Sequence, residues 1–461
     1  MTALDGPADR AQPLTSIPAR LPADPATTGS RQAAAATDAA RPIRVLHIIT
    51  GLAAGGAEEQ LRLLLPRLAG HGMAAEVAVF YQAGSVAQAL RADGIPVTDL
   101  RSPGFWDRRG TARLAGLVKA GGYDVVHTHL FRAGLHGRIA ARRAGVRTLV
   151  HTEHSLNPVL IEGRRRNPAI DRLYRWAERR GTLTVAVSSA VARELAGLGV
   201  PAERIRILPN AIAPDQLAYD RKERADFRAE HGLAADDFVV LCLGRLAASK
   251  RLELAIEAVA GLDPERYPGV RLLFVGAGEE LEPLTALAGQ QLPGRAVFTG
   301  ELPGARLSAA LSAADLLLSP SPEETFGLAV LGAAAVGLPV AFASCPALTE
   351  PGLAGPQAVE LDPAVPEPAG ALPASLQWVP STPTALGRAI RRTADARSGP
   401  EPTERQADPA LAEALRSYDV ESIAAQLAQL YRELLGPSPD GPPAPENDRN
   451  TRERRVGVHH V

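Results

Sequence analysis

Cysteine is scarce in this sequence, and neither sign of charge is in excess. Among 461 residues there are only two cysteines, Cys242 and Cys345, and both stand in apolar surroundings. So few cysteines exclude a framework of disulfides and are typical of proteins from a reducing compartment. The formal net charge at pH 7 is −1, so we expect no general attraction to nucleic acid or to another strongly charged partner.

The two ends of the chain lack the features of folded or targeting segments. Residues 1–40 are rich in Ala, Pro and Thr, carry several aspartates and contain no apolar block of the signal-peptide kind. We predict that they form a disordered leader. Residues 437–461 are rich in Pro, Glu and Arg and are predicted to form a disordered tail.

One uncharged stretch, residues 328–348, is long enough to cross a bilayer. Gly337 and Pro339 divide it, however, into a helical piece of about ten residues and a short strand. We therefore interpret it as part of a buried α/β unit and not as a membrane span.

Short runs of Val, Ile and Leu alternate with longer segments of helical period. The runs are residues 43–49, 75–80, 124–129, 147–152, 183–188, 238–244, 271–276, 295–300, 315–320 and 339–344. Continuous apolar strands separated by helices predict parallel sheets that helices cover on both faces. The predicted fold class is therefore α/β.

The alternation pauses between Asn210 and Asp237, where a charged connecting segment takes the place of an apolar run. We predict an N-terminal domain over residues 41–213 and a C-terminal domain over residues 214–416. Each is expected to be a doubly wound, Rossmann-like domain, with its ligand beyond the carboxyl ends of the strands.

The last predicted element is a terminal amphipathic helix within residues 417–436. Ile423, Leu427, Leu430 and Leu434 share one face of it. The Pro-rich residues 351–383 receive no assignment.

A predicted strand-to-helix loop carries Arg245 and Lys250. Cations beside a helix N-terminus form an anion site, because the free amides and the helix dipole add to their charge. Lys119, Lys222 and Lys250 are the only lysines of the chain, which otherwise uses arginine. A lysine at this junction suggests a point-charge contact to phosphate. A solvated surface pair with Glu253 is the alternative.

Glycines mark the turns after two of these strands. Gly244 forms the turn before Arg245, and Gly276 and Gly278 follow the next strand. A G-x-G sequence without the third glycine is weak evidence of dinucleotide binding. We interpret it as a tight turn that lets the base or ribose of a nucleotide approach the backbone.

Glu324 lies at another predicted strand-to-helix turn, in "EETFG". The amides of Phe326, Gly327 and Leu328 form the free end of the helix that follows. A carboxylate is favourable there and could simply cap the helix. Beside a diphosphate site it could instead hold sugar hydroxyls, because it accepts two hydrogen bonds with fixed geometry. Both interpretations stay open at this point.

Together these motifs resemble those of the retaining glycosyltransferases of family 4, which have the two-domain GT-B fold with the domains facing each other across a cleft. The matching segments are "GLAAGGAEEQLRLLLPRL", "YDVVHTHLFRAGLHGRIAARRAGV", "HTEHS", "VSSAVARELAGLGVPAERIRILPNAI", "GRLAASKRLELAIEA", "VGAGEELEPL" and "EETFGLAVLGAAAVGLPV". They occupy about residues 43–345 in the family's order, and the last of them is specific to the family.

The resemblance implies roles for the candidate residues. Arg245 and Lys250 would hold the diphosphate of the donor, and Glu324 would bind the transferred sugar. The amides of residues 326–328 would face phosphate or sugar. "GLAAGG", which contains Gly55 and Gly56, would close against the donor from the first domain.

His154 in "HTEHS" matches the position whose histidine lies near the reacting sugar, so His154 and Glu324 are the implied catalytic residues. A histidine satisfied at a strand end is the alternative for His154. His127, His129 and His151 are expected to serve packing or acceptor contacts. An H-x-H metal site at "HTH" is conceivable, but the order and spacing of the motifs fit the transferase better.

No D-x-D motif occurs in the sequence, which disfavours a metal-dependent GT-A mechanism. We therefore expect no metal and no cofactor, only the nucleotide-diphosphate sugar as donor substrate.

Two positions depart from the family's pattern. The second glutamate of the motif, which usually binds the nucleotide ribose, is here Gly332, and "PNAI" has Ala211 where glycine is common. A hydrogen bond to a charged group contributes about 1.5–3 kcal/mol, so losing one or two would weaken donor binding by roughly ten- to a few hundred-fold. This predicts altered ribose recognition and not a dead site.

The expected acceptor side is rich in arginine. Residues 138–147 and 163–180 carry many arginines, and Leu173, Tyr174 and Trp176 lie among them. A basic amphipathic helix of this kind could rest on an anionic membrane or receive a lipid-diphosphate acceptor. An ordinary surface helix in a lysine-poor chain is the alternative.

The predicted protein is thus a hexosyltransferase-type enzyme. It moves a sugar from a nucleotide-diphosphate sugar to a hydroxyl of a glycan, a lipid-linked acceptor or a small molecule, with retention of configuration. Its expected location is the cytoplasm, including the inner face of the membrane as a peripheral protein. The alternative is a catalytically degenerate GT-B subunit that binds or regulates.

Overall fold

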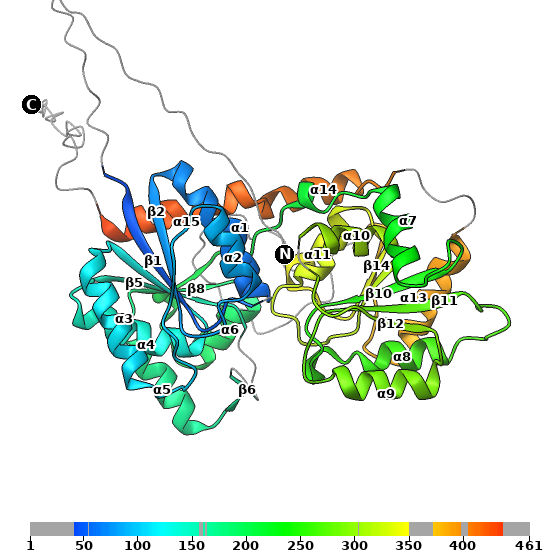
Figure 1. The fold of residues 1–461 in the computed structure, drawn as a ribbon, viewed down its shortest axis with the longest axis horizontal. Coiled ribbons are helices and arrows are strands. Elements are labelled where there is room, and N and C mark those ends of the chain that lie inside the picture. The colour runs from blue at the N-terminus through cyan, green and yellow to red at the C-terminus, as the bar shows by residue number, and fades with distance from the viewer. Residues whose placement is uncertain are drawn as a thin grey trace, which may run out of the picture. The chain divides into compact units, whose positions relative to one another are not determined.

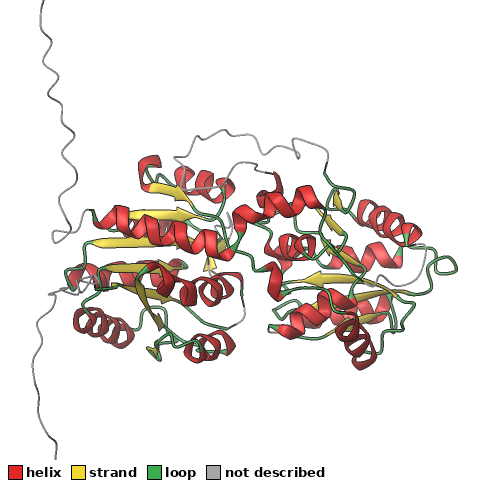
Figure 2. Cartoon of the chain, turned by 90° about the horizontal axis from the view of Figure 1, so that it is seen from above, coloured by secondary structure: helices red, strands yellow, loops and turns green. Residues whose placement is uncertain are grey.

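A computed structural model of the chain describes residues 41–53, 55–155, 160–161, 164–302, 304–349, 372–397 and 404–436. The predicted leader and tail lie outside the described residues. The two large sheets are parallel and lie between layers of helices (Figure 2).

The first half of the chain forms a seven-stranded sheet in the order β3-β2-β1-β4-β5-β8-β9. Its strands are β1 (Ile43–Ile49), β2 (Met73–Val79), β3 (Val97–Asp99), β4 (Val125–His129), β5 (Thr148–Glu153), β8 (Leu183–Ala186) and β9 (Ile205–Ile207). After β1 the chain adds β2 and β3 on one side of it, and after β4 it adds β5, β8 and β9 on the other side. The switch point of this sheet, where ligands bind in such folds, therefore lies beyond the ends of β1 and β4.

Side chains of β1 alternate between two cores. Val45 and Ile49 face one core, whereas Leu46 and Ile48 face the other. The first core lies under α1 (Gly56–Leu68) and α15 (Val420–Leu435), and the second lies under α3 (Arg108–Gly121) and α4 (Phe131–Arg143) (Figure 1). The helices of this half are α1 (Gly56–Leu68), α2 (Ser85–Ala92), α3 (Arg108–Gly121), α4 (Phe131–Arg143), α5 (Pro168–Glu178) and α6 (Ser189–Gly197). A short hairpin, β6 (Leu160–Ile161) with β7 (Arg164–Arg165), precedes α5.

The second half forms a six-stranded sheet in the order β12-β11-β10-β13-β14-β15. Its strands are β10 (Phe238–Leu243), β11 (Val270–Val275), β12 (Ala296–Phe298), β13 (Leu316–Ser319), β14 (Val340–Phe342) and β15 (Leu376–Trp378). By the same reasoning, its switch point lies beyond the ends of β10 and β13.

Helices cover both faces of this sheet as well (Figure 1). One face carries α8 (Glu253–Ala260), α9 (Leu281–Gln291) and α13 (Pro383–Ala396), and the other carries α7 (Arg221–Glu230), α10 (Ala305–Ala313), α11 (Leu328–Ala335) and α14 (Pro409–Leu415). The remaining short elements are α12 (Pro346–Thr349), η1 (Ala69–His71), η2 (Ala202–Arg204), η3 (Pro214–Gln216), η4 (Ala248–Lys250) and η5 (Arg416–Tyr418).

The last helix, α15 (Val420–Leu435), returns to the first sheet. Its apolar face, with Ile423, Leu427 and Leu430, is buried in the core of the first half beside α1. This confirms the amphipathic pattern, although the helix begins a few residues later than the predicted segment.

Each predicted apolar run became a strand, and the α/β fold class is confirmed. The uncharged stretch divides as expected into α11 and β14. The strands β3, β9 and β15 of these sheets were not predicted, because β3 and β9 include polar residues and β15 lies in the Pro-rich stretch that received no assignment. The predicted boundary at residues 213–214 falls between β9 and β10. No helix in the described part of the chain combines the length and the apolar composition that a bilayer span requires.

Candidate functional site

Lys250 and Glu324 come from loops that follow neighbouring strands, and their side chains meet. Lys250 ends η4, which follows β10, and Glu324 lies between β13 and α11. Nζ of Lys250 donates a hydrogen bond to Oε1 of Glu324 over 2.6 Å, and the two side chains are 31% and 14% exposed. The pair therefore lies at the switch point of the second sheet, within reach of solvent.

Serine hydroxyls hold these loops together independently of the ion pair. The buried Ser321 hydroxyl donates to the carbonyl of Ser249 over 3.3 Å, and Ser381 donates to the carbonyl of Pro320 over 2.6 Å. These contacts position the loops that carry Lys250 and Glu324.

The two arginines in the loop between β10 and α8 do not pair with Glu324 as Lys250 does. Arg245 is exposed, and we find no hydrogen bond or ion pair from its guanidinium to the described residues. The surface pair between Lys250 and Glu253 does not form, because Glu253 pairs with Arg251 over 3.1 Å while Lys250 reaches Glu324. The structure thus joins two of the three predicted ligands and leaves Arg245 in solvent.

Gly327 sets the start of α11. It is the N-cap residue, has φ +100° and lies so close to Cys345 that an added Cβ would overlap the thiol. In the described part of the chain no side chain caps this helix, and Glu324 accepts from Lys250, so the capping interpretation of Glu324 is not the one observed there. Among the same residues, the first amides of α11, beginning at Leu328, have no side-chain acceptor. Phe326 is buried edge-on against Tyr418, with ring centroids 5.5 Å apart.

The glycines after β10 and β11 allow two loops to pack backbone to backbone. Gly244 and Gly276 have φ of +133° and +141°. A Cβ at Gly276 would overlap the carbonyl of Gly244, and one at Gly278 would overlap the carbonyl of Leu246. The amide of Leu246 also donates to Ala277 over 2.9 Å. Packing of the two loops therefore requires these glycines, whatever ligand the loops bind.

The two departures from the family pattern have distinct surroundings. Gly332 is buried on α11, and an added Cβ would lie 3.4 Å from Cδ1 of Leu217, an ordinary contact distance. Ala211 is buried, and its amide and carbonyl exchange hydrogen bonds of 2.6 and 2.9 Å with the side-chain amide of Gln60.

The switch point of the first sheet gathers Gly55, Gly56 and His129. The glycines begin α1 after β1, and His129 is the last residue of β4. The next residue, Leu130, has φ +70° and ψ +161°, a region that normally admits only glycine. Strain of this kind often accompanies functional loops, and nothing in the sequence indicates it.

His154 is buried directly after β5, and its Nε2 lies 3.1 Å from Nδ1 of His129. Burial lowers the pKa of His154 to about 3. The imidazole is therefore neutral at physiological pH, so it can donate one hydrogen bond and accept one, but it is not a general acid.

The other histidines make buried polar contacts. His127 bonds the Tyr431 hydroxyl through Nδ1 over 2.6 Å and the Thr152 hydroxyl through Nε2 over 2.7 Å. On the opposite face of the sheet, Nδ1 of His151 lies 3.0 Å from the hydroxyl of Thr128.

Glu153 was missed by the sequence analysis. It is buried next to His154 and accepts a hydrogen bond of 2.7 Å from the Tyr174 hydroxyl. Burial raises the pKa of its carboxyl to about 7. Its place inside "HTEHS", directly before His154, is the sequence signal that could have drawn attention to it.

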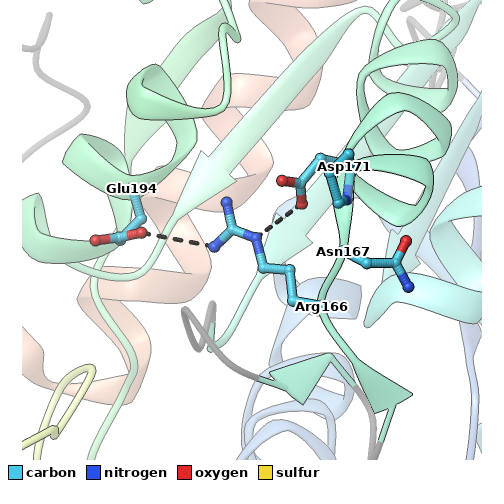
Figure 3. A pocket seen from close by; sticks show the side chains of 5 residues that line it. Arg166, Asn167, Asp171 and Glu194 are labelled. Carbon is cyan, nitrogen blue, oxygen red and sulfur yellow. Dashed lines mark hydrogen bonds and ion pairs between the residues drawn. The ribbon is translucent and has the colours of Figure 1, made fainter.

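A polar hollow of about 440 Å³ lies at the start of α5 (Figure 3). Arg166 stands in it between Asp171, at 2.8 Å, and Glu194, at 3.9 Å. Asn167 caps α5. Because two carboxylates already flank the guanidinium, this hollow does not favour an anion.

The arginine-rich helix α5 is amphipathic. Tyr174 is buried, whereas Arg172, Arg175 and Arg179 are exposed. Trp176 is 40% exposed, and the guanidinium of the neighbouring Arg180 lies 3.5 Å from the centre of its ring.

Two family models match the chain. The model described as Glycosyltransferase Family 4 matches residues 54–216, and that described as Glycosyl transferases group 1 matches residues 223–350. Between them they span both switch points and the loops described above.

Curated relatives match about half of the chain. The D-inositol 3-phosphate glycosyltransferase of Mycobacteroides abscessus is 33% identical over 254 residues, which are 51% of this chain and 54% of that protein. The 2-deoxystreptamine glucosyltransferase of Streptomyces kanamyceticus is 32% identical over 231 residues, 47% of this chain and 59% of that protein. The chain thus spans about half the length of the curated relatives it matches.

Solved structures share the fold at lower identity. HepE from Anabaena in complex with UDP-glucose superposes with a TM-score of 0.67 at 22% identity and covers 84% of this chain and 99% of that one. The lipopolysaccharide glycosyltransferase WaaG superposes with a TM-score of 0.59 at 18% identity, over 84% of this chain and 99% of that one.

Proposed function

Because the chain belongs to glycosyltransferase family 4 and has the GT-B fold, we propose that it is a retaining hexosyltransferase that uses a nucleotide-diphosphate sugar. The contact between Lys250 and Glu324 carries this proposal. It joins a cation suited to phosphate and a carboxylate suited to sugar hydroxyls at the switch point of one sheet.

Each group has a distinct task in the proposed reaction. Lys250 and the first amides of α11 bind the diphosphate, and Arg245 turns inward from solvent to join them. As the bond between the sugar and the diphosphate breaks, negative charge builds on the leaving group, and these donors stabilise it. Glu324 accepts hydrogen bonds from the sugar hydroxyls and so orients the ring. With cations and amides in this role, we propose a transfer step that needs no metal at the diphosphate.

The names of the curated relatives support a small-molecule acceptor. One is named for inositol 3-phosphate and another for 2-deoxystreptamine. Among the three predicted acceptor classes, we therefore propose a small polyhydroxylated ring. Neutral His154, at the end of β5, is proposed to lie near the reacting sugar and to exchange hydrogen bonds with its hydroxyls.

Purified protein tests the proposal in two steps. A thermal-shift screen of UDP, GDP, ADP and TDP identifies the base, and the matching sugar nucleotides are then incubated with inositol 3-phosphate. We expect donor-dependent glycosylation of the acceptor, measured by mass spectrometry. If nucleoside diphosphates raise the melting temperature but no donor is hydrolysed or transferred, the chain is a binding subunit and the proposed activity is wrong.

Lys250→Ala tests the phosphate contact. Because a hydrogen bond to a charged group contributes about 1.5–3 kcal/mol, we expect nucleoside diphosphate binding to weaken roughly ten- to a hundred-fold, with nucleoside binding little changed. Lys222→Ala is the matched control, since Lys222 is exposed and pairs only with its helix neighbour Asp226. If the affinities for nucleoside and for nucleoside diphosphate fell equally, Lys250 would not be the phosphate contact.

We also propose that α5 brings the enzyme to anionic membranes as a peripheral protein. The exposed arginines of α5 and the half-exposed Trp176 support this contact. Co-sedimentation with anionic vesicles is expected and should fall in an Arg172→Gln, Arg175→Gln, Arg179→Gln variant. Equal binding to zwitterionic vesicles, or no effect of the variant, would contradict it.

A further inference from the structure

The register of the first sheet brings three histidines to one place. His47 on β1 pairs with His127 on β4, and His129 follows two residues later on the same face. Ring centroids lie 4.3 Å apart for His127 and His129 and 5.2 Å apart for His47 and His127. One nitrogen of each ring lies within 4.8 Å of a nitrogen of the other two.

All three rings are buried under α1 and α15. Each imidazole has one nitrogen that carries a lone pair when the ring is uncharged. Neutral imidazole is the form that binds metal ions.

Hydrogen bonds among the rings do not satisfy every nitrogen. Nδ1 of His47 lies 3.0 Å from Nε2 of His129, and Nδ1 of His129 lies 3.1 Å from Nε2 of His154. The outer nitrogens, Nε2 of His47 and Nδ1 of His154, have no partner among the described residues. Three neutral imidazoles carry three N–H groups, so two hydrogen bonds leave one N–H and one lone pair buried without partners.

We propose that His47, His127 and His129 bind one transition-metal ion of the kind that prefers imidazole, such as Zn²⁺. A cavity of about 30 Å³, the scale of a single small ion or water, is lined on its polar side by these rings, His154 and Thr152 and elsewhere mainly by apolar side chains of α1, α15 and the neighbouring strands. Imidazole nitrogens bound to one Zn²⁺ at ~2.0–2.1 Å lie at most ~4.2 Å apart. Shifts of less than about an ångström therefore bring the three nitrogens, now within 4.8 Å of one another, into ligand positions.

Bound metal would also set the tautomers of the cluster. When Nε2 of His129 binds the ion, its proton lies on Nδ1 and is donated to Nε2 of His154. His127 exchanges one of its contacts, to Tyr431 or to Thr152, for the ion, and the other contact orients the ring. This ion is separate from any metal at the diphosphate. The expectation of no metal rested on the missing D-x-D motif, which concerns only the diphosphate, and on assigning "HTH" to packing or acceptor contacts. The proposal departs from that second assignment.

Metal analysis of the full chain, expressed without a histidine tag, tests the proposal. The protein is stripped with a chelator and titrated with Zn²⁺ or Co²⁺ alone. We expect one equivalent of Zn²⁺ per chain, a melting temperature that rises on adding it back, and visible Co²⁺ bands typical of nitrogen ligation. A wild-type protein that retains no ion and shows no such bands overturns the proposal.

Variants locate the ion. We expect His47→Ala to weaken Zn²⁺ binding roughly a hundredfold or more, and the His71→Ala control, in η1, to leave it unchanged. Adjacent histidines in the tail, His459 and His460, could bind ions adventitiously, so a His459→Ala, His460→Ala variant must keep the ion. If it loses the ion, the proposed site is wrong. If His47→Ala does not fold, the Co²⁺ spectrum of the tail variant decides. Bands typical of nitrogen ligation in that variant support the buried site, and their absence contradicts it.

Discussion

Gly327 decides where Glu324 can lie. Its positive φ turns the chain from the loop into α11, and Cys345 leaves no room for a Cβ. The carbonyl of Phe326 is held at the same time by the amide of Ala347 over 3.1 Å. The geometry of the ion pair with Lys250 thus depends on the backbone conformation of Gly327.

Gly327→Ala is therefore expected to destabilise the protein. Left-handed backbone costs a residue with a Cβ about 1–2 kcal/mol, and overpacking against the buried thiol adds about 1–3 kcal/mol. Urea unfolding should show the loss, together with weaker nucleoside diphosphate binding. Gly289→Ala is the control: it lies in α9 with open space around it and should stabilise by up to about 1 kcal/mol. Similar stabilities for the two variants would contradict the role of Gly327.

Gly332 tests the prediction of altered ribose recognition. Its surroundings admit a Cβ beside Leu217, so Gly332→Glu can restore the acid of the family pattern. We expect it to tighten donor binding roughly ten- to a hundred-fold, because a charged hydrogen bond contributes about 1.5–3 kcal/mol. Calorimetric titration would measure this, with Gly332→Gln as the uncharged control. A folded Gly332→Glu variant that binds donor like the wild type would disprove the ribose explanation.

Among the elements, α15 is the one whose place could not be inferred from its neighbours in the chain. Its amphipathic pattern predicts burial but not the surface that buries it. In the structure it completes the core of the first half, and the Tyr431 hydroxyl bonds Nδ1 of His127 across 304 positions of sequence. The helix therefore stabilises the same histidine cluster that β1 and β4 assemble.

Tyr431→Phe is expected to cost about 1–3 kcal/mol of unfolding free energy, because it leaves a buried imidazole nitrogen without its partner. Chemical denaturation monitored by circular dichroism would measure it. Leu435→Ala, at the exposed end of the same helix, should change stability by less than about 0.5 kcal/mol. A Tyr431→Phe variant as stable as the wild type would show that water replaces the hydroxyl without cost.

For the molecule as a whole, the buried histidines dominate the expected pH dependence of stability. Burial lowers the pKa values of six of them: to about 3 for His47, His151 and His154, well below the usual value for His127 and His129, and below the usual value for His136. A lowered pKa means that the unfolded state binds more protons, so each contribution is complete above about pH 6.5 and is lost as the pH falls toward the folded pKa. The contribution of Glu153 to stability has the opposite sign. Its raised pKa stabilises the folded state at low pH, and this stabilisation is lost as the pH rises through about 7.

The six histidines outweigh the single glutamate, so we expect stability to fall as the pH is lowered from 7.5 to 5.5. Each histidine contributes up to about 1.4 kcal/mol per pH unit below its unfolded pKa. Urea midpoints at pH 7.5, 6.5 and 5.5 would measure the slope. Glu153→Gln removes the opposing contribution and should make the slope steeper. A flat profile in the wild type would contradict the burial of neutral histidines.

The local sequence pattern was sufficient to predict most of the fold and the loops of the candidate site. Apolar runs separated by helical segments determine two parallel sheets, because strand and helix periods are read within a few residues of sequence. The turns with Gly244 and Gly327, and the loops with Lys250 and Glu324, follow from the ends of those strands. Family motifs added the expectation that these loops bind one donor.

Only the tertiary structure decided which side chains meet. Lys250 could have paired with nearby Glu253, yet it reaches Glu324 because β10 and β13 are neighbours in the sheet. His47 meets His127 for the same reason, through the order of β1 and β4. Strand order results from packing the whole chain so that each face of a sheet has its own core. Contacts between residues far apart in the sequence leave no periodic pattern from which they could be predicted.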